Sequence, residues 1–208
     1  MVAWPAAMNQ RRRAGPDAHS APEGAPRRSI LSGAAGLLLA WMTPRRAAAQ
    51  EPDPRGRPAP GDLLVKVRDT SLTPLTPGDV PLGSSPTMAW PMTPESGVVK
   101  SGSRLNRILL VGLDPDALVE PTRTRAAGGV VAYSAVCTHT GCEVGTYLGD
   151  EQLLYCECHQ SKFDPRDQAR VTDGPAPRSL PALPLRVVDG RLVVAGPFTT
   201  RPGFEPGV

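Results

Sequence analysis

Aromatic residues are scarce in this chain. They make up 4% of the 208 residues, whereas the chain holds 25 prolines and 21 glycines. Such a composition favours short strands, turns and extended segments over long helices. The length allows one domain of ordinary size with additional segments. We therefore expect a globular domain with little helix.

Basic side chains are scarce outside the first 49 residues. Seven arginines there stand against Asp17 and Glu23, so a formal net charge of +3 for the whole chain leaves a net −2 for the remainder. Residues 50–208 contain no run that is rich in lysine or arginine and interleaved with aromatic residues. This absence argues against a nucleic acid as the partner.

The chain also lacks an apolar run long enough to cross a membrane. The candidate run at residues 30–42 spans about 20 Å as a helix, short of a hydrocarbon layer of roughly 30 Å. Arg27 and Arg28 precede this run and "AAAQ" follows it, which is typical of a cleaved signal peptide. The arginine pair resembles a twin-arginine export signal, which carries proteins across the membrane already folded.

We therefore predict a twin-arginine-type signal peptide over residues 1–49, with cleavage near Gln50 and a periplasmic location for the mature protein. The alternative is an uncleaved leader that anchors the protein in the membrane, facing the periplasm. In this sequence the leader is the only segment through which membrane association is expected.

Beyond the leader we predict three segments: a proline-rich linker at 50–61, a domain at 62–200 and a tail at 201–208. β-rich runs predict strands at 62–69, 107–113, 128–136 and 151–156. The turn-rich stretch 70–106 is expected to hold one short strand. Alternating runs on both sides of Asp189-Gly190 predict a hairpin. Together these elements predict an all-β fold, a small antiparallel sandwich or barrel.

Cysteine and histidine are rare, and they are concentrated in two short boxes. The boxes "CTHTGC" at 137–142 and "CECHQS" at 156–161 hold all four cysteines and two of the three histidines. The third histidine, His19, lies in the leader. This concentration indicates a metal site, because cysteine and histidine are the preferred ligands of iron–sulfur clusters and zinc.

Each box offers one cysteine and one histidine at ligand spacing: Cys137 and His139 in the first, Cys156 and His159 in the second. A mixed [2Fe–2S] centre needs this division, because one iron takes two thiolates and the other takes two imidazoles. A zinc site on the same residues is an alternative. Another is a metal-free domain with disulfides Cys137–Cys156 and Cys142–Cys158.

The two boxes resemble those of Rieske iron–sulfur proteins, in the disulfide-containing, high-potential form of cytochrome bc complexes and arsenite oxidases. The resemblance covers residues 107–197 and implies a cluster-binding subdomain, at about 128–181, inserted in the β domain. It implies one [2Fe–2S] cluster on the four ligand residues and a disulfide between Cys142 and Cys158. Such a disulfide agrees with export, because most cytoplasms would reduce it.

Residues beside the second box are expected to tune the cluster. In the high-potential subunits, the serine that matches Ser161 hydrogen-bonds a bridging sulfide. A tyrosine that donates to a ligand sulfur is replaced here by Phe163, and the usual glycine is replaced by Gln160. Thr140 stands where subunits of bc complexes have leucine, which argues against quinol as a direct partner. Residues 173–181 resemble the proline loop that covers the cluster in this family.

These features predict one-electron transfer by a periplasmic carrier or a small subunit of an oxidoreductase. The expected partner is a larger oxidoreductase subunit or a c-type cytochrome. The alternative is the Rieske subunit of a membrane quinol–cytochrome c reductase of the bc type. We expect no catalytic residues in this chain, because it contains no serine, histidine and acid set and no phosphate-binding loop.

Overall fold

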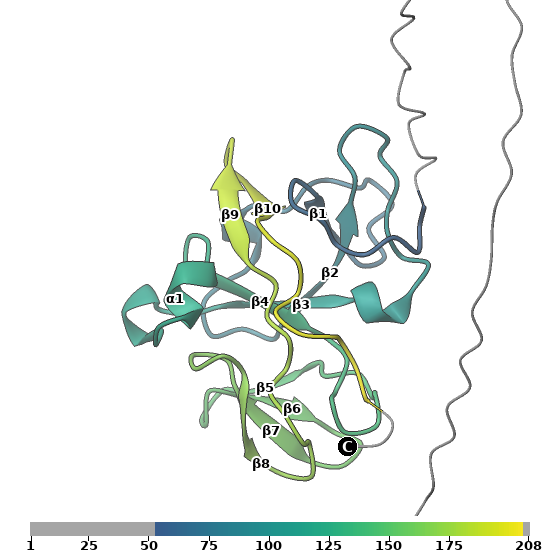
Figure 1. The fold of residues 1–208 in the computed structure, drawn as a ribbon. Coiled ribbons are helices and arrows are strands. Elements are labelled where there is room, and N and C mark those ends of the chain that lie inside the picture. Colours follow the sequence, from purple (N-terminus) through teal and green to yellow (C-terminus); the bar gives the residue numbers. More distant parts are fainter. Residues whose placement is uncertain (1–52, 206–208) are drawn as a thin grey trace, which may run out of the picture. The chain divides into compact units, whose positions relative to one another are not determined.

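The fold is that of a computed structural model, which describes residues 53–205. It contains two antiparallel sheets, a six-stranded sheet of order β4-β3-β2-β1-β10-β9 and a four-stranded sheet of order β5-β6-β7-β8 (Figure 1). This arrangement confirms the all-β prediction. No helix among the described residues is long and apolar enough to cross a bilayer. The predicted signal peptide lies outside the described residues.

The strands of the six-stranded sheet are β1 (Leu63–Lys66), β2 (Thr87–Met92), β3 (Ile108–Gly112), β4 (Val130–Ser134), β9 (Leu185–Val188) and β10 (Arg191–Val194). Those of the four-stranded sheet are β5 (Thr146–Leu148), β6 (Leu153–Cys156), β7 (Ser161–Asp164) and β8 (Arg170–Asp173). Helical structure is limited to the 3-10 turns η1 (Pro77–Asp79), η2 (Arg104–Asn106) and η3 (Pro115–Ala117) and to α1 (Thr122–Arg125).

Strand β3 is buried on both faces, because alternate side chains of a strand point to opposite sides of the sheet. Leu109 and Val111 pack in one apolar cluster, and Ile108 and Leu110 pack in the other. The first cluster also contains Phe163 of β7, so one face of the six-stranded sheet packs against the four-stranded sheet. Cys137 and Cys156 of the two boxes belong to this first cluster, between the two sheets.

The four-stranded sheet is inserted between β4 and β9, as the sequence predicts for a cluster-binding subdomain. Tyr133 of β4 connects the two sheets, because its hydroxyl donates a 2.8 Å hydrogen bond to the carbonyl of Pro165, which follows β7. Burial raises the pKa of Tyr133 above its ordinary value. The phenol therefore stays protonated and keeps donating this bond at physiological pH.

The predicted hairpin at Asp189-Gly190 is present. Strands β9 and β10 pair from Arg191 opposite Val188 onward. Both turn residues have positive φ, 49° at Asp189 and 75° at Gly190, as a two-residue type I′ turn requires. The hairpin places β10 beside β1, where Leu63 pairs with Val193, and leaves β9 at the edge of the six-stranded sheet.

Candidate metal centre

Two tight turns present the boxes. In the first, the amide of Cys137 donates to the carbonyl of Cys142 at 2.8 Å, and the amide of Gly141 donates to the carbonyl of Cys137 at 3.0 Å. In the second, which connects β6 and β7, the amide of Gln160 donates to the carbonyl of Cys156 at 2.9 Å. Both turns are thus fixed by the backbone, and the ligand side chains project from them.

A disulfide joins Cys142 in the first turn to Cys158 in the second. This confirms the pairing that the family resemblance implied. Cys137 and Cys156 are buried free thiols. The structure therefore contradicts the alternative of a metal-free domain with a second disulfide between them. The Sγ atoms of Cys142, Cys156 and Cys158 lie within 4.8 Å of one another, which places the disulfide directly beside a free thiol.

The two free thiols lie in a largely apolar environment, with 1% of Cys137 and none of Cys156 exposed. Burial, with the neighbouring Cys156 thiol, raises the pKa of Cys137 to about 11, while the hydroxyl of Ser161 acts in the opposite direction by hydrogen bonding. A buried thiol with a raised pKa is inert toward oxidants and electrophiles. A metal has to displace its proton in order to bind there.

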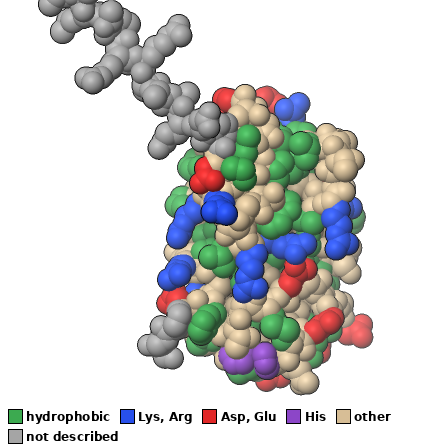
Figure 2. Space-filling view, turned by 90° about the vertical axis from the view of Figure 1, so that its right-hand side faces the viewer, with side chains coloured by type: hydrophobic (Ala, Val, Ile, Leu, Met, Phe, Trp, Pro, Cys, Tyr) green, Lys and Arg blue, Asp and Glu red, His purple; other side chains and the backbone are tan. Residues whose placement is uncertain are grey.

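The two histidines lie side by side. The ring centroids of His139 and His159 are 4.6 Å apart, with the planes at 87°. His139 is half-buried and His159 is exposed. The histidine side chains reach the surface together at one end of the molecule (Figure 2). The imidazole pair is therefore the part of the site that another molecule can approach.

The Nδ1 atom of His139 is buried and has no hydrogen-bond partner among the described residues. Buried polar atoms are nearly always paired, so an unpaired imidazole nitrogen in the same turn as the free thiol Cys137 indicates a missing ligand. Thiolate and imidazole donors suit an iron–sulfur cluster or zinc. The donor set, two buried thiols and two adjacent imidazoles, fits a [2Fe–2S] cluster of the mixed kind.

A third loop covers the thiols, where the sequence predicts a proline loop. The amide of Ala176 in this loop donates to Oγ of Ser161 at 3.1 Å, and the hydroxyl of Thr138 donates to the carbonyl of Arg178 at 2.6 Å. Gly174 lets the backbone of this loop approach the backbone of Ser161 closely. Its φ is +85°, and a Cβ there would lie 2.5 Å from Cα of Ser161. The three loops therefore hold one another in place.

The residues that were expected to tune the cluster are fully buried. Ser161 and Phe163 are both 0% exposed. Phe163 packs in the same apolar cluster as Leu154, its cross-strand partner in β6. The Phe163 ring supplies apolar contact and no hydrogen-bond donor. The hydroxyl of Ser161 accepts a hydrogen bond from the amide of Ala176 in the proline loop and still has its own hydrogen to donate.

One contributor to this site was missed by the sequence analysis. The guanidinium of Arg178 donates to the carbonyls of Arg201 and Gly203, at 2.8 and 2.7 Å, and contacts the carboxylate of Glu205 at 3.2 Å. It thereby fixes the last described residues against the proline loop. Phe204, in that segment, lines a hollow of about 400 Å³ that also borders His139. No local pattern around Arg178 indicates this role, because its partners lie more than twenty positions away.

Comparisons with known proteins agree with this geometry. The family described as Rieske [2Fe-2S] domain matches residues 107–184. The Rieske iron–sulfur subunit of the cytochrome bc1 complex of Streptomyces lividans is 37% identical over 142 residues, which cover 66% of this chain and 82% of that protein. The chain therefore belongs to the Rieske [2Fe–2S] family: it holds a [2Fe–2S] cluster and transfers electrons.

This chain covers less than half of the length of two further relatives. A putative respiratory nitrate reductase Rieske subunit of Haloferax mediterranei is 40% identical over 107 residues, 50% of this chain and 46% of that protein. The bc1 Rieske subunit of Streptomyces coelicolor is 37% identical over 142 residues but is covered for only 39% of its length. Among solved structures, the ferredoxin of carbazole 1,9a-dioxygenase from Nocardioides aromaticivorans is 19% identical, with a TM-score of 0.39, over 64% of this chain and 98% of that one.

Proposed function

We propose that the cluster is held by Cys137, Cys156, His139 and His159, and that the protein acts as a periplasmic one-electron carrier or as the small subunit of an oxidoreductase. The observation that carries this proposal is the unpartnered, buried Nδ1 of His139, in the turn that also holds the buried free thiol Cys137. When bound, the cluster supplies a one-electron couple whose potential is raised by its two neutral imidazole ligands.

The thiols, the disulfide and Ser161 each have a separate role in the proposed site. The two buried thiols bind as thiolates, so loading releases the proton that Cys137, with its pKa of about 11, otherwise retains. The disulfide between Cys142 and Cys158 keeps the two turns at a fixed separation while the cluster changes charge. Ser161, oriented by the amide of Ala176, is placed to donate its hydroxyl hydrogen toward sulfur.

Electrons are proposed to leave through the histidine end. His159 is exposed and His139 borders an open hollow, whereas both thiols are buried beneath the loops. A partner that contacts the imidazoles comes as near to the cluster as the protein surface permits. The proposed partner is a larger oxidoreductase subunit or a c-type cytochrome, and the relative from Haloferax mediterranei, named as a nitrate reductase subunit, supports the former.

The periplasmic location rests on the leader and on the disulfide. The leader is proposed to direct export in the folded state, which a protein loaded with its cluster in the cytoplasm requires. A disulfide formed after export is stable in the periplasm.

The second candidate is the Rieske subunit of a bc-type complex that oxidises quinol, because the relatives from Streptomyces are named as bc1 subunits. Against it stands Thr140, which is exposed beside the histidines and presents a polar surface to a quinol ring. Retention of the leader as an anchor would favour this second candidate over the first.

The experiment is a stopped-flow measurement with the mature, cluster-loaded protein. Reduced protein is mixed with an oxidised c-type cytochrome, and oxidised protein is mixed with a short-chain quinol. We expect second-order reduction of the haem and slow or absent reduction by quinol. Thr140→Glu, beside the imidazoles, should change the rate with cytochrome severalfold, whereas Leu72→Glu, exposed and outside the boxes, should not. Fast reduction by quinol would replace the first candidate with the second.

A further inference from the structure

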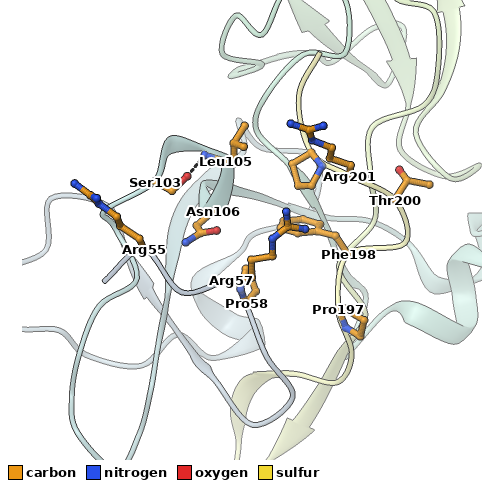
Figure 3. A pocket seen from close by; sticks show the side chains of 11 residues that line it. Arg55, Arg57, Pro58, Ser103, Leu105, Asn106, Pro197, Phe198, Thr200 and Arg201 are labelled. Atoms are coloured by element: carbon orange, nitrogen blue, oxygen red, sulfur yellow. Dashed lines mark hydrogen bonds between the residues drawn. The ribbon is translucent and has the colours of Figure 1, made fainter. Parts of the chain in front are cut away.

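A second cavity lies outside the cluster-binding loops. Three segments far apart in the sequence meet around it: the proline-rich segment at 55–58, the turn at 103–106, and the chain at 197–202 (Figure 3). Its volume is about 430 Å³, which is the size range of pockets for small molecules. None of its lining residues belongs to the two boxes or to the proline loop.

The charged lining of this cavity is entirely positive. Arg55, Arg57 and Arg201 contribute to it, and no acidic residue does. None of these three guanidinium groups forms an ion pair with a carboxylate among residues 53–205, whereas Arg107 and Arg166 each do. Three unpaired guanidinium groups around one cavity create a positive potential there, and arginine binds carboxylates and phosphates through two parallel hydrogen bonds.

The remainder of the lining is largely apolar. The contributing residues are Pro58, Leu105, Pro197, Phe198 and Pro202. Phe198 also packs against the apolar cluster of the six-stranded sheet, so this wall is held in place. Proline rings have fixed backbone angles and lose little entropy when a ligand binds. The cavity therefore offers a preformed surface for an apolar ring as well as a positive rim.

Two polar groups in the lining differ in what they offer a ligand: Ser103 offers a donor that suits an anionic group, whereas Asn106 offers an acceptor that suits only an O–H or N–H of a ligand. Asn106 is 2% exposed, and its Nδ2 donates to the carbonyls of Gly56 and Lys100, at 2.7 and 3.0 Å, which fixes the orientation of the amide. Its carbonyl oxygen accepts no hydrogen bond from the described residues and lies on the cavity side in Figure 3. Oγ of Ser103 accepts from the amide of Leu105 at 3.3 Å, which leaves its hydrogen free to donate.

From this lining we infer a binding site for a small organic anion, an apolar ring system that carries one carboxylate or phosphate group. The anionic group would lie near the guanidinium groups of Arg57 and Arg201, because that of Arg55 points away from the cavity (Figure 3), and the ring would lie against Phe198 and Leu105. An inorganic anion leaves the apolar wall uncovered, and a neutral ring leaves the guanidinium groups without a counter-charge. Neither is therefore expected to bind as well as a molecule that combines both parts.

The test is isothermal titration calorimetry on the mature, cluster-loaded protein. The probes are 1-naphthyl phosphate and 1-naphthoate, with inorganic phosphate and 1-naphthol as the separate halves. We expect at least one naphthyl anion to bind about tenfold or more tightly than either half, and salt to weaken that binding. Equal affinities of the naphthyl anions and 1-naphthol would overturn the proposal, since that pattern indicates apolar adsorption alone.

Variants locate the site. Arg57→Gln and Arg201→Gln should each weaken binding of the preferred naphthyl anion about three- to tenfold, because each removes a charged donor from an open rim. Arg191→Gln, an exposed arginine at the start of β10 outside the lining, is the matched control and should leave the affinity unchanged. Thermal unfolding and the visible spectrum of the cluster verify that each variant is folded. An equal loss in Arg191→Gln would show that binding follows net charge and that the cavity is not the site.

Discussion

Replacing Ser161 by alanine tests how the protein tunes the cluster. Ser161 is 0% exposed and its Oγ accepts a 3.1 Å hydrogen bond from the amide of Ala176. Because the amide of Ala176 fixes this oxygen, the hydroxyl hydrogen can point toward Sγ of Cys137. The hydrogen bond from Ser161 acts against the rise in the pKa of Cys137. A donor to sulfur stabilises the extra electron of the reduced state, so its removal should lower the reduction potential.

The magnitude follows from the net contribution of a single hydrogen bond. A contribution of about 1 kcal/mol corresponds, for a one-electron couple, to roughly 40 mV. We therefore expect Ser161→Ala to lower the potential by about 40 mV. The variant also leaves the buried amide of Ala176 without its acceptor, which should reduce the free energy of unfolding by about 1–3 kcal/mol.

The assay is protein-film voltammetry combined with thermal unfolding, and Ser134→Ala is the matched control. Ser134 is also 0% exposed and accepts from a backbone amide, that of Val136 at 3.2 Å, but it lies in β4 and outside the boxes. The control should lose stability and keep its potential. An unchanged potential in Ser161→Ala, or an equal drop in both variants, would refute the tuning role of this hydroxyl.

Three further changes give independent checks. Phe163→Tyr should raise the potential in voltammetry by roughly 40 mV, by restoring a donor near a ligand sulfur, and a drop would contradict the environment inferred from the family. Gln160→Gly should raise the free energy of unfolding by about 0.5–1 kcal/mol in denaturant titrations, because Gln160 has a φ of 60°; a loss of stability would contradict this. Arg178→Ala should speed hydrogen exchange in the segment 201–205, which Arg178 fixes, whereas Arg186→Ala on exposed β9 should not; equal exchange rates in both would count against this role.

Much of the site could be predicted because its chemistry is local. Each box holds a cysteine and a histidine at ligand spacing within six residues, so the spacing predicts the four proposed ligands. Strands β3 and β4 were predictable because long β-branched and aliphatic runs are typical of buried strands. The hairpin at Asp189-Gly190 was predictable because few residue pairs favour a type I′ turn so strongly.

Other features depend on contacts that no local pattern shows. Strand β2 contains Pro91, which lowers the strand propensity of its segment. Pro91 pairs with Leu64 of β1 but lies beyond the ladder with β3, which covers only residues 87–89, so no β3 partner needs the N–H that proline lacks. Strands β5, β7 and β8 were missed. Strands β5 and β8 are short and not buried, and β7 is a four-residue strand that begins within the second box. The arginine-lined cavity combines three segments that only the tertiary fold brings together.

The central claim is that two imidazoles and two thiolates hold one [2Fe–2S] cluster. Residues 50–208 contain two histidines, His139 and His159, so in a variant that begins at Gln50, labelling all histidine with ¹⁵N marks the two proposed nitrogen ligands alone. Pulsed electron paramagnetic resonance of the reduced, labelled protein should show two strongly coupled ¹⁵N nuclei, in a sample with two irons and two acid-labile sulfides per chain. Zinc as the stoichiometric metal, or a reduced cluster without ¹⁵N coupling, would contradict the account.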